Sequence, residues 1–283
     1  MRTSAGRVVG RGFLFLICLC VPAFCGRPAA AAERAPRVVC LSDVAEGRRQ
    51  ALSESLRAIT GWRGLHFDSD GLLRLGDAPS SGGSPTARAL LDSAQTGPNL
   101  IFIEDASGRA DVVFGRVSQA RLKSDANRAG SLTAPAFLVQ IDFADFAHVT
   151  GDEAARAAFN AGWVLLHEIS HVVGGTNDAE RAGEAGDCEA LVNLMRRECD
   201  LAVRAEYHFR LFPGQGRGEF RTRYVRLAFE LPDPATNRRR RLWLMWDAGL
   251  VGGLPEGGDC DRPARAAAGP REARVAVLGN TLR

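Results

Sequence analysis

The sequence contains no internal repeat, almost no lysine, and no apolar run long enough to cross a membrane. Its strongest apolar run, residues 13–21, is shorter than the ~20 residues that a membrane-spanning helix needs. Lys123 is the only lysine, so the basic charge comes from arginine. No Cys-x-x-Cys pair occurs, which argues against a zinc site built from cysteines alone. These absences exclude a multi-span membrane protein and a repeat array.

The N-terminal segment is typical of a secretory signal peptide. Three arginines precede the apolar run, and the small residues 29–32 supply a cleavage site before Glu33. We therefore expect residues 1–32 to be removed and the mature protein to be secreted or periplasmic, without stable insertion in a membrane. A retained anchor is the alternative.

Removal of this segment changes the charge and the cysteine content. The formal net charge falls from +3 to −1, because four arginines and no acidic residue leave with residues 1–32. Nucleic acid is therefore not an expected partner. The mature chain keeps an even number of cysteines, which in an exported protein favours two disulfides. They are Cys40, Cys188, Cys199 and Cys260.

Geometry narrows the pairing of these cysteines. If Cys188 and Cys199 lie on one helix, a rise of roughly 16 Å separates them, beyond the ~7 Å Cα limit for a disulfide. Each is then expected to bond with Cys40 or Cys260, which would tie the ends of the chain to this helix. Free buried thiols are the alternative, and an oxidising compartment argues against Cys188 as a metal ligand.

The most informative motif consists of His167, Glu168 and His171. On an α-helix, positions i and i+4 lie on one face, so both imidazoles can reach a single ion. Glu168 projects from the neighbouring flank, where it can take a proton from a zinc-bound water. The motif therefore predicts a catalytic zinc site.

The residues around the motif predict one long, buried helix. Thr150 and Glu153 form a capping-box pattern, a strongly apolar run follows, and Gly174 and Gly175 end it. Two imidazoles and a carboxylate inside such a helix need partners that offset their desolvation. A metal ion is such a partner.

With these residues the chain resembles the zincin superfamily of zinc-dependent metallopeptidases. The resemblance implies a zincin-like fold in which the two histidines hold one Zn²⁺, Glu168 activates the water, and a peptide or protein substrate is hydrolysed. It implies an edge strand that lines the substrate cleft; residues 137–143 are the candidate, and a core strand without a substrate role is the alternative. Zincins often add a later Tyr or His that stabilises the oxyanion, and the candidates are Tyr207, His208 and Tyr224.

The sequence offers several candidates for the third metal ligand. The metzincin pattern requires a histidine where Asn177 stands. The gluzincin pattern instead implies a Glu from a second helix, and Glu189 is the predicted ligand, on a helix capped by Asp187. Asn193 then takes the place of the acid that holds a ligating histidine. The alternative carboxylate ligands are Asp178, Glu184 and Asp187.

The wider pattern predicts an α+β domain over residues 33–254. Its mixed N-terminal half contains helices over 42–59 and 84–95 and strands over 100–104, 111–115 and 137–143. The central motif helix and the downstream ligand helix follow. A C-terminal β-hairpin has strands over 224–231 and 241–246, with the basic run 238–241 at its solvated turn. Residues 255–283 are expected to form a flexible tail.

Three functions are consistent with this sequence. The leading one is an exported zinc metallopeptidase. The alternative is a secreted, non-catalytic zinc-binding or interaction protein on a zincin fold, although such a protein would not need Glu168. The third is a disulfide-stabilised envelope or interaction protein without a metal. Substrate specificity depends on the shape of the cleft, which a motif does not determine.

Overall fold

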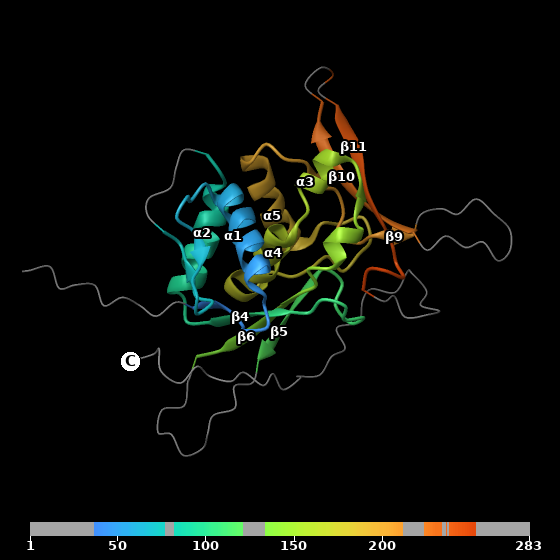
Figure 1. The fold of residues 1–283 in the computed structure, drawn as a ribbon. Helices are drawn as coiled ribbons and strands as arrows, with labels where there is room; N and C mark the ends of the chain where they lie inside the picture. The colour runs from blue at the N-terminus through green and yellow to red at the C-terminus, as the bar shows by residue number, and fades with distance from the viewer. Residues whose placement is uncertain are drawn as a thin grey trace, which may run out of the picture. The chain divides into compact units, whose positions relative to one another are not determined.

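Helix α4 (Ala161–Gly174) lies at the centre of the structure, a computed structural model that describes residues 37–76, 82–120, 134–211, 224–233, 236 and 238–252. Three helices contact it: α1 (Glu46–Thr60), α2 (Pro85–Thr96) and α5 (Gly186–Glu198). These helices cover one side of a sheet that contains β4, β5 and β6 (Figure 1). The predicted α+β class is confirmed.

This first sheet has the order β1-β4-β6-β5. Strands β1 (Val38–Cys40), β4 (Leu100–Asp105) and β6 (Ala136–Ile141) are parallel, whereas β5 (Gly115–Ala120) pairs antiparallel with β6. A separate small hairpin is formed by β2 (His66–Phe67) and β3 (Leu73–Arg74). Among the described residues, β5 is therefore an edge strand next to α4.

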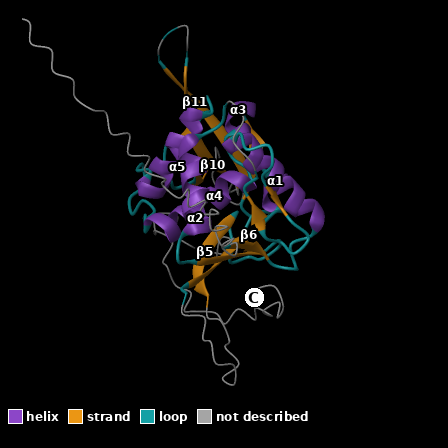
Figure 2. Ribbon diagram, turned by 90° about the vertical axis from the view of Figure 1, so that its left-hand side faces the viewer, coloured by secondary structure: helices purple, strands orange, loops and turns teal. Residues whose placement is uncertain are grey.

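The second sheet is antiparallel and has the order β7-β11-β10-β8, with β9 also paired to β10. Its long hairpin consists of β10 (Tyr224–Pro232) and β11 (Arg239–Asp247). The short strands are β7 (Thr150–Gly151), β8 (Val203–Arg204) and β9 (Arg210–Leu211). Figure 2 shows this hairpin beside α3 (Glu153–Ala157), away from β5 and β6.

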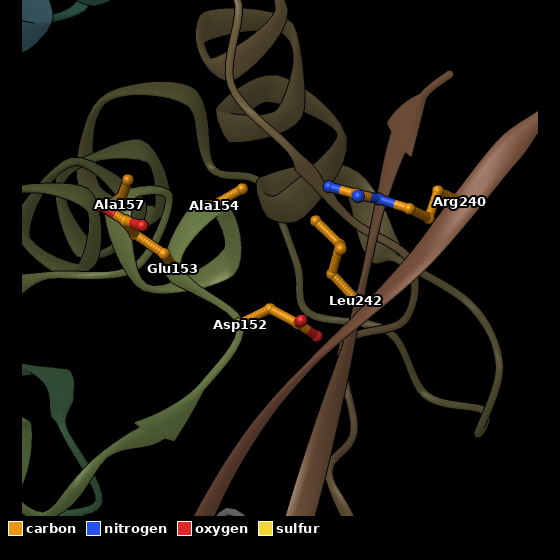
Figure 3. Close-up of a pocket in the computed structure, with 6 residues that line it drawn as sticks. All are labelled: Asp152, Glu153, Ala154, Ala157, Arg240 and Leu242. Carbon is orange, nitrogen blue, oxygen red and sulfur yellow. The ribbon is translucent and has the colours of Figure 1, made fainter. Parts of the chain in front are cut away.

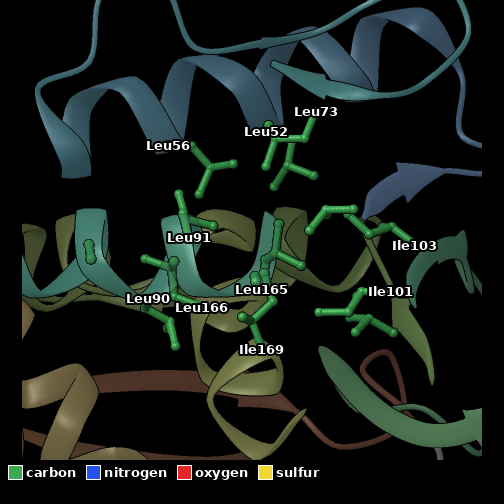
Figure 4. Packing of buried hydrophobic residues seen from close by; sticks show 14 of the residues in the cluster. Leu52, Leu56, Leu73, Leu90, Leu91, Ile101, Ile103, Leu165, Leu166 and Ile169 are labelled. Carbon is green, nitrogen blue, oxygen red and sulfur yellow. The ribbon is translucent and has the colours of Figure 1, made fainter. Parts of the chain in front are cut away.

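The main core joins the helices to the first sheet. Leucines of α1 and α2 pack against Leu165, Leu166 and Ile169 of α4 and against Ile101 and Ile103 of β4 (Figure 4). A second cluster joins α3 and the start of α4 to the hairpin. Helix α4 therefore contacts both cores, which accounts for its apolar character on nearly all sides.

The predicted single helix through the motif is wrong at its N-terminal end. Thr150 belongs to β7 and pairs with Met245 of β11, so it caps no helix. A break separates α3 from α4, and Asn160 caps α4 by accepting hydrogen bonds from the N–H groups of Gly162 and Trp163. The predicted end is confirmed, because Gly175 adopts the left-handed conformation after the last turn.

The other helices follow their sequence signals closely. Helix α2 begins at Pro85, next to the predicted start, and Ser84 caps it by accepting a hydrogen bond from the N–H of Ala87. Helix α1 begins at Glu46, four residues later than predicted, and ends at Gly61 in the left-handed conformation. Helix α5 begins at Gly186 after Ala185, whose side chain makes no cap, so the predicted cap at Asp187 is wrong.

The predicted strand over 111–115 is also wrong, because residues 111–114 form a loop and β5 starts at Gly115. Phe114 has a φ of 60°, which is incompatible with an extended strand, and its N–H donates to the Asp145 carboxylate at 2.9 Å. The predicted strand 137–143 corresponds to β6, but β6 lies between β4 and β5. The edge position predicted for it belongs to β5.

The C-terminal hairpin is confirmed, and Val225, Leu227 and Phe229 are buried on its apolar face. Strand β11 begins at Arg239, two residues earlier than predicted, so residues 239–241 of the basic run lie in the strand and not at the turn. The arginines of the run are exposed, as predicted. Arg241 pairs with Glu230 across the hairpin at 3.3 Å.

Some predictions fall outside the described residues. These are the signal peptide over residues 1–32, the tail over 255–283 and any bond made by Cys260. None of the helices within the described ranges has the length and apolar character needed to span a bilayer.

We expect Leu91→Ala to destabilise the protein by about 3 kcal/mol, because the fully buried Leu91 fills the core between α2 and α4. Urea unfolding of both chains measures this difference. Leu194→Ala is the matched control, since Leu194 is a helical leucine that is 40% exposed, and its loss should cost less than about 0.5 kcal/mol. Equal losses for the two variants would contradict the assigned core.

Candidate metal centre

Four side chains converge at the C-terminal half of α4. They come from α4 itself, from the loop that follows it and from the first turn of α5: His167, His171, Asp178 and Cys188. Each offers one ligand atom, and these four atoms all lie within 4.8 Å of one another. This group can hold a metal ion, as the two histidines of the motif predict.

The distances between the donors define the centre. Asp178 Oδ1 lies 2.9 Å from His167 Nε2 and 3.5 Å from His171 Nε2. Cys188 Sγ lies 3.5 Å from His171 Nε2. The side chain of Asp178 is 36% exposed while Cys188 is fully buried, so the cluster faces solvent on its Asp178 side.

The loop after α4 fixes the ring of His171. The carbonyl oxygen of Thr176 lies 2.8 Å from His171 Nδ1 and accepts a hydrogen bond from it. This contact directs Nε2 toward Asp178, as a backbone partner does for metal-binding histidines in general. The turn at Gly175 therefore helps to set the donor geometry.

Glu189 lies on the other side of the His167 ring, close to Nδ1 but without a hydrogen bond to it. Glu189 Oε2 lies 3.4 Å from His167 Nδ1, and both groups are buried. The other face of the ring lies parallel to Tyr207, with ring centroids 5.8 Å apart. Nε2 is thus left to face Asp178, the arrangement of a carboxylate behind a ligating imidazole.

Glu189 also neutralises two guanidinium groups, of which that of Arg196 is buried and that of Arg204 is partly buried. Arg196 donates to Glu189 Oε1, and Arg204 donates to Oε2 at 3.1 Å. Burial alone would raise the pKa of Glu189, but these two cations hold it well below its usual range. Asn193 accepts from the Arg204 backbone N–H and from the Arg196 side chain rather than binding a histidine.

Glu189 therefore lies outside the donor cluster, with its oxygens directed at the two arginines and at His167 Nδ1. The structure instead brings in Asp178, which the sequence left as an alternative ligand. The other two alternatives, Glu184 and Asp187, are exposed and outside the cluster. The sequence signal for Asp178 was its place in a tight loop that starts at Gly175.

The donors form an ion-paired group. Burial lowers the pKa of His167, but its contacts with Asp178 and Glu189 outweigh this and raise the pKa to about 10. In the same way, Asp178 raises the pKa of His171 to about 11 against the effect of burial. The pKa of Asp178 lies well below its usual range despite burial, because it faces both imidazoles. A metal ion that binds here displaces the protons of the imidazoles.

Glu168 lies beside the cluster, on the flank of α4 that faces β5. It is 6% exposed, and burial raises its pKa while the two motif imidazoles act in the opposite direction. The backbone N–H of Val117 in β5 interacts with its carboxylate. A Cβ atom at Gly115 would lie 2.5 Å from Val164 Cγ1 and 3.7 Å from Glu168 Oε1, so a glycine is needed where β5 crosses α4.

Of the three candidate oxyanion donors, the structure brings only Tyr207 to the cluster. Its hydroxyl donates to Asp178 Oδ2 at 2.8 Å. His208 Nε2 lies 3.0 Å from the carbonyl oxygen of Ala179, and Tyr224 is 52% exposed at the start of β10.

The cysteines do not follow the predicted pairing within the described residues. Cys40, Cys188 and Cys199 are free thiols, so neither predicted bond from Cys40 to α5 forms. The premise that Cys188 and Cys199 belong to one helical segment is confirmed, because α5 ends at Glu198 and Cys199 is its C-cap. Burial raises the pKa of Cys40 to about 12, which makes it an inert core thiol.

A surface cavity of about 420 Å³ lies between α3 and β11 (Figure 3). Its lining residues are Asp152, Glu153, Ala154, Ala157, Arg240 and Leu242. None of them is a candidate metal ligand, and Asp152 accepts a hydrogen bond from the N–H of Trp243. The cavity is therefore not part of the metal centre.

No family model matches this chain, and no curated protein or solved structure shows significant similarity to it. The chemistry of the four-donor cluster and its surroundings therefore carries the functional inference. The distinguishing feature of that cluster is a mixed set of nitrogen, oxygen and sulfur donors on two helices and one loop.

Asp178→Asn is expected to weaken metal binding by about 100-fold or more, since even partners outside the ligand set contribute 10- to 100-fold. Competition with a chromophoric chelator measures the affinity. The matched control is Asp187→Asn, which changes an exposed acid outside the cluster and should leave the affinity unchanged. An unchanged affinity in Asp178→Asn would remove Asp178 from the ligand set.

Glu189→Gln is expected to destabilise the metal-free protein by about 3 kcal/mol, because Arg196 and Arg204 lose their buried counter-charge. Urea unfolding in the presence of a chelator separates this effect from metal binding. Glu184→Gln, at an exposed position, is the control. If Glu189 served only as a metal ligand, the metal-free stability would not change.

Proposed function

We propose that this protein is an exported zinc-dependent metallopeptidase with a zincin-like fold, in which His167, His171 and Asp178 hold one Zn²⁺ and Glu168 is the general base. The observation that carries the proposal is the convergence of both motif imidazoles and a loop carboxylate beside a buried Glu on the same helix. Asp178 replaces Glu189 as the third ligand in this proposal. Peptide or protein substrates are the expected partners.

The donor set supports zinc over other common ions. Imidazole, carboxylate and thiolate are the ligands that zinc accepts in tetrahedral sites. Magnesium and calcium prefer oxygen ligands, and this cluster offers oxygen only from Asp178. The carboxylate of Glu189 lies 3.4 Å from His167 Nδ1, at the place where metal-binding histidines commonly have a carboxylate partner.

The surroundings of Glu168 support its role as the base. A bound zinc ion polarises a substrate carbonyl and makes a coordinated water acidic. Glu168 then accepts a proton from the attacking water and passes it to the leaving amine. Its burial, which raises its pKa, suits a group that must take and return a proton. Tyr207, beside Asp178, is the best-placed donor for the oxyanion.

Strand β5 supports a peptide as the substrate. Among the described residues it pairs only with β6, so its other edge can add an extended chain through backbone hydrogen bonds. Gly115 and Val117 of this strand lie beside Glu168. A peptide on this edge would therefore run past the base.

One observation favours a second candidate, a secreted zinc-binding protein without hydrolytic activity. Cys188 offers a fourth donor, and zinc sites with four protein ligands are commonly structural. A binding protein would have no use for a buried carboxylate at Glu168, which is why the peptidase is preferred.

Glu168→Gln is expected to lower the hydrolysis of labelled, denatured casein by about 10²- to 10⁴-fold and to leave the zinc content unchanged, because it removes only the base. The comparison is made in the wild-type chain and in Cys188→Ala, where the fourth position is free. Glu180→Gln, an exposed acid, is the control. Zinc binding without hydrolysis in both the wild-type chain and Cys188→Ala favours the second candidate. Full activity in Glu168→Gln means that the base is another group.

A further inference from the structure

The surroundings of Cys188 differ from those of a cysteine that only fills the hydrophobic core. It occupies the first turn of α5, is fully buried, and forms no disulfide. Its Sγ atom lies 3.1 Å from His171 Nδ1, 3.5 Å from His171 Nε2 and 2.8 Å from Thr176 Oγ1. All three contacts are with polar groups of the candidate metal centre.

The spacing around Cys188 agrees with a tetrahedral metal site. Zinc bonds of about 2.3 Å to sulfur and about 2.0 to 2.1 Å to nitrogen or oxygen imply separations of about 3.5 Å between sulfur and nitrogen and about 3.4 Å between nitrogen and oxygen. The distances of His171 Nε2 from Cys188 Sγ and from Asp178 Oδ1 are both 3.5 Å. The pair of His167 and Asp178 is closer, at 2.9 Å, because it makes a direct hydrogen bond, and must open by roughly half an ångström.

Neighbouring groups hold Cys188 in this place. Glu189, the next residue, is fixed by Arg196 and Arg204, so the first turn of α5 cannot easily move away from α4. Thr176 both orients His171 through its carbonyl oxygen and contacts Cys188 Sγ through its hydroxyl. The same loop therefore positions two of the four donors.

We propose that Cys188, as a thiolate, is the fourth ligand of the metal ion and occupies the coordination position that the attacking water needs. The resting centre is then closed by four protein ligands. For water to take this position, the bond between the metal and the Cys188 sulfur would have to break and a bond from the metal to the water oxygen would have to form. The released thiolate would take up a proton from solvent, and Glu168 would still accept the proton of the attacking water. The ligation follows from the donor geometry, whereas the resulting latency rests on the proposed peptidase function.

The test uses the full mature chain, purified under reducing conditions and loaded with Co²⁺ or Zn²⁺ alone. Wild-type protein is expected to show an intense near-ultraviolet sulfur-to-cobalt charge-transfer band and, with zinc, a sulfur scatterer at about 2.3 Å in X-ray absorption. Cys188→Ala should lose both signals and bind zinc at least ~10-fold more weakly. Cys199→Ser is the matched control, since Cys199 is the other cysteine at the boundary of α5 and lies outside the cluster.

The outcomes separate this inference from the proposed function. Absence of the sulfur signals in the wild-type protein overturns the ligation, whether or not casein is hydrolysed, and this measurement does not depend on the folding of a variant. Sulfur ligation together with at least ~10-fold faster hydrolysis in Cys188→Ala supports both the ligation and the latency. Sulfur ligation without hydrolysis in either chain supports the ligation and overturns the latency and the peptidase assignment.

Discussion

The buried carboxylate of Glu189 connects the two helices of the metal centre. It neutralises Arg196 and Arg204 and faces the ring of His167, so α5 cannot shift without leaving charges unpaired in the core. An unpaired buried charge costs several kcal/mol, which makes this network more restrictive than apolar packing alone. The positions of His167 on α4 and of Cys188 on α5 both depend on it. Glu189, which the gluzincin pattern implied as a metal ligand, thus stabilises the two helices around the candidate metal centre.

Helix α4 links the candidate metal centre to the rest of the molecule. Its apolar residues pack into two cores, one with α1, α2 and the first sheet and one with the C-terminal hairpin. A helix held on all sides presents the imidazoles in a fixed geometry, which a metal site requires. The crossing of β5 over α4 at Gly115 then brings an open strand edge next to Glu168. The positions of Glu168, of the candidate metal donors and of the β5 edge therefore all depend on one helix.

The cysteines illustrate how context changes the meaning of a residue. An even count after signal removal favoured disulfides, yet Cys40 is an inert core thiol and Cys188 lies among metal donors. Helix geometry correctly predicted that Cys188 and Cys199 do not bond with each other. It could not indicate that Cys188 would face His171. That contact depends on the loop over residues 175–185, which turns the chain back across the end of α4. Residue counts carry no information about such a turn.

The sequence by itself determined the elements whose signals are local. Helical periodicity placed His167 and His171 on one face, Gly175 ended α4, Ser84 began α2, and alternation of apolar residues marked the hairpin. Only the tertiary structure decided which carboxylate joins the imidazoles, which strand is the edge, and where α4 begins. Asp178 reaches the centre, Glu189 meets Arg204, and Thr150 pairs with β11 through contacts between residues far apart along the chain or through the path of an irregular loop. Periodicity reports the environment of a single element, whereas these contacts are set by how elements pack against one another.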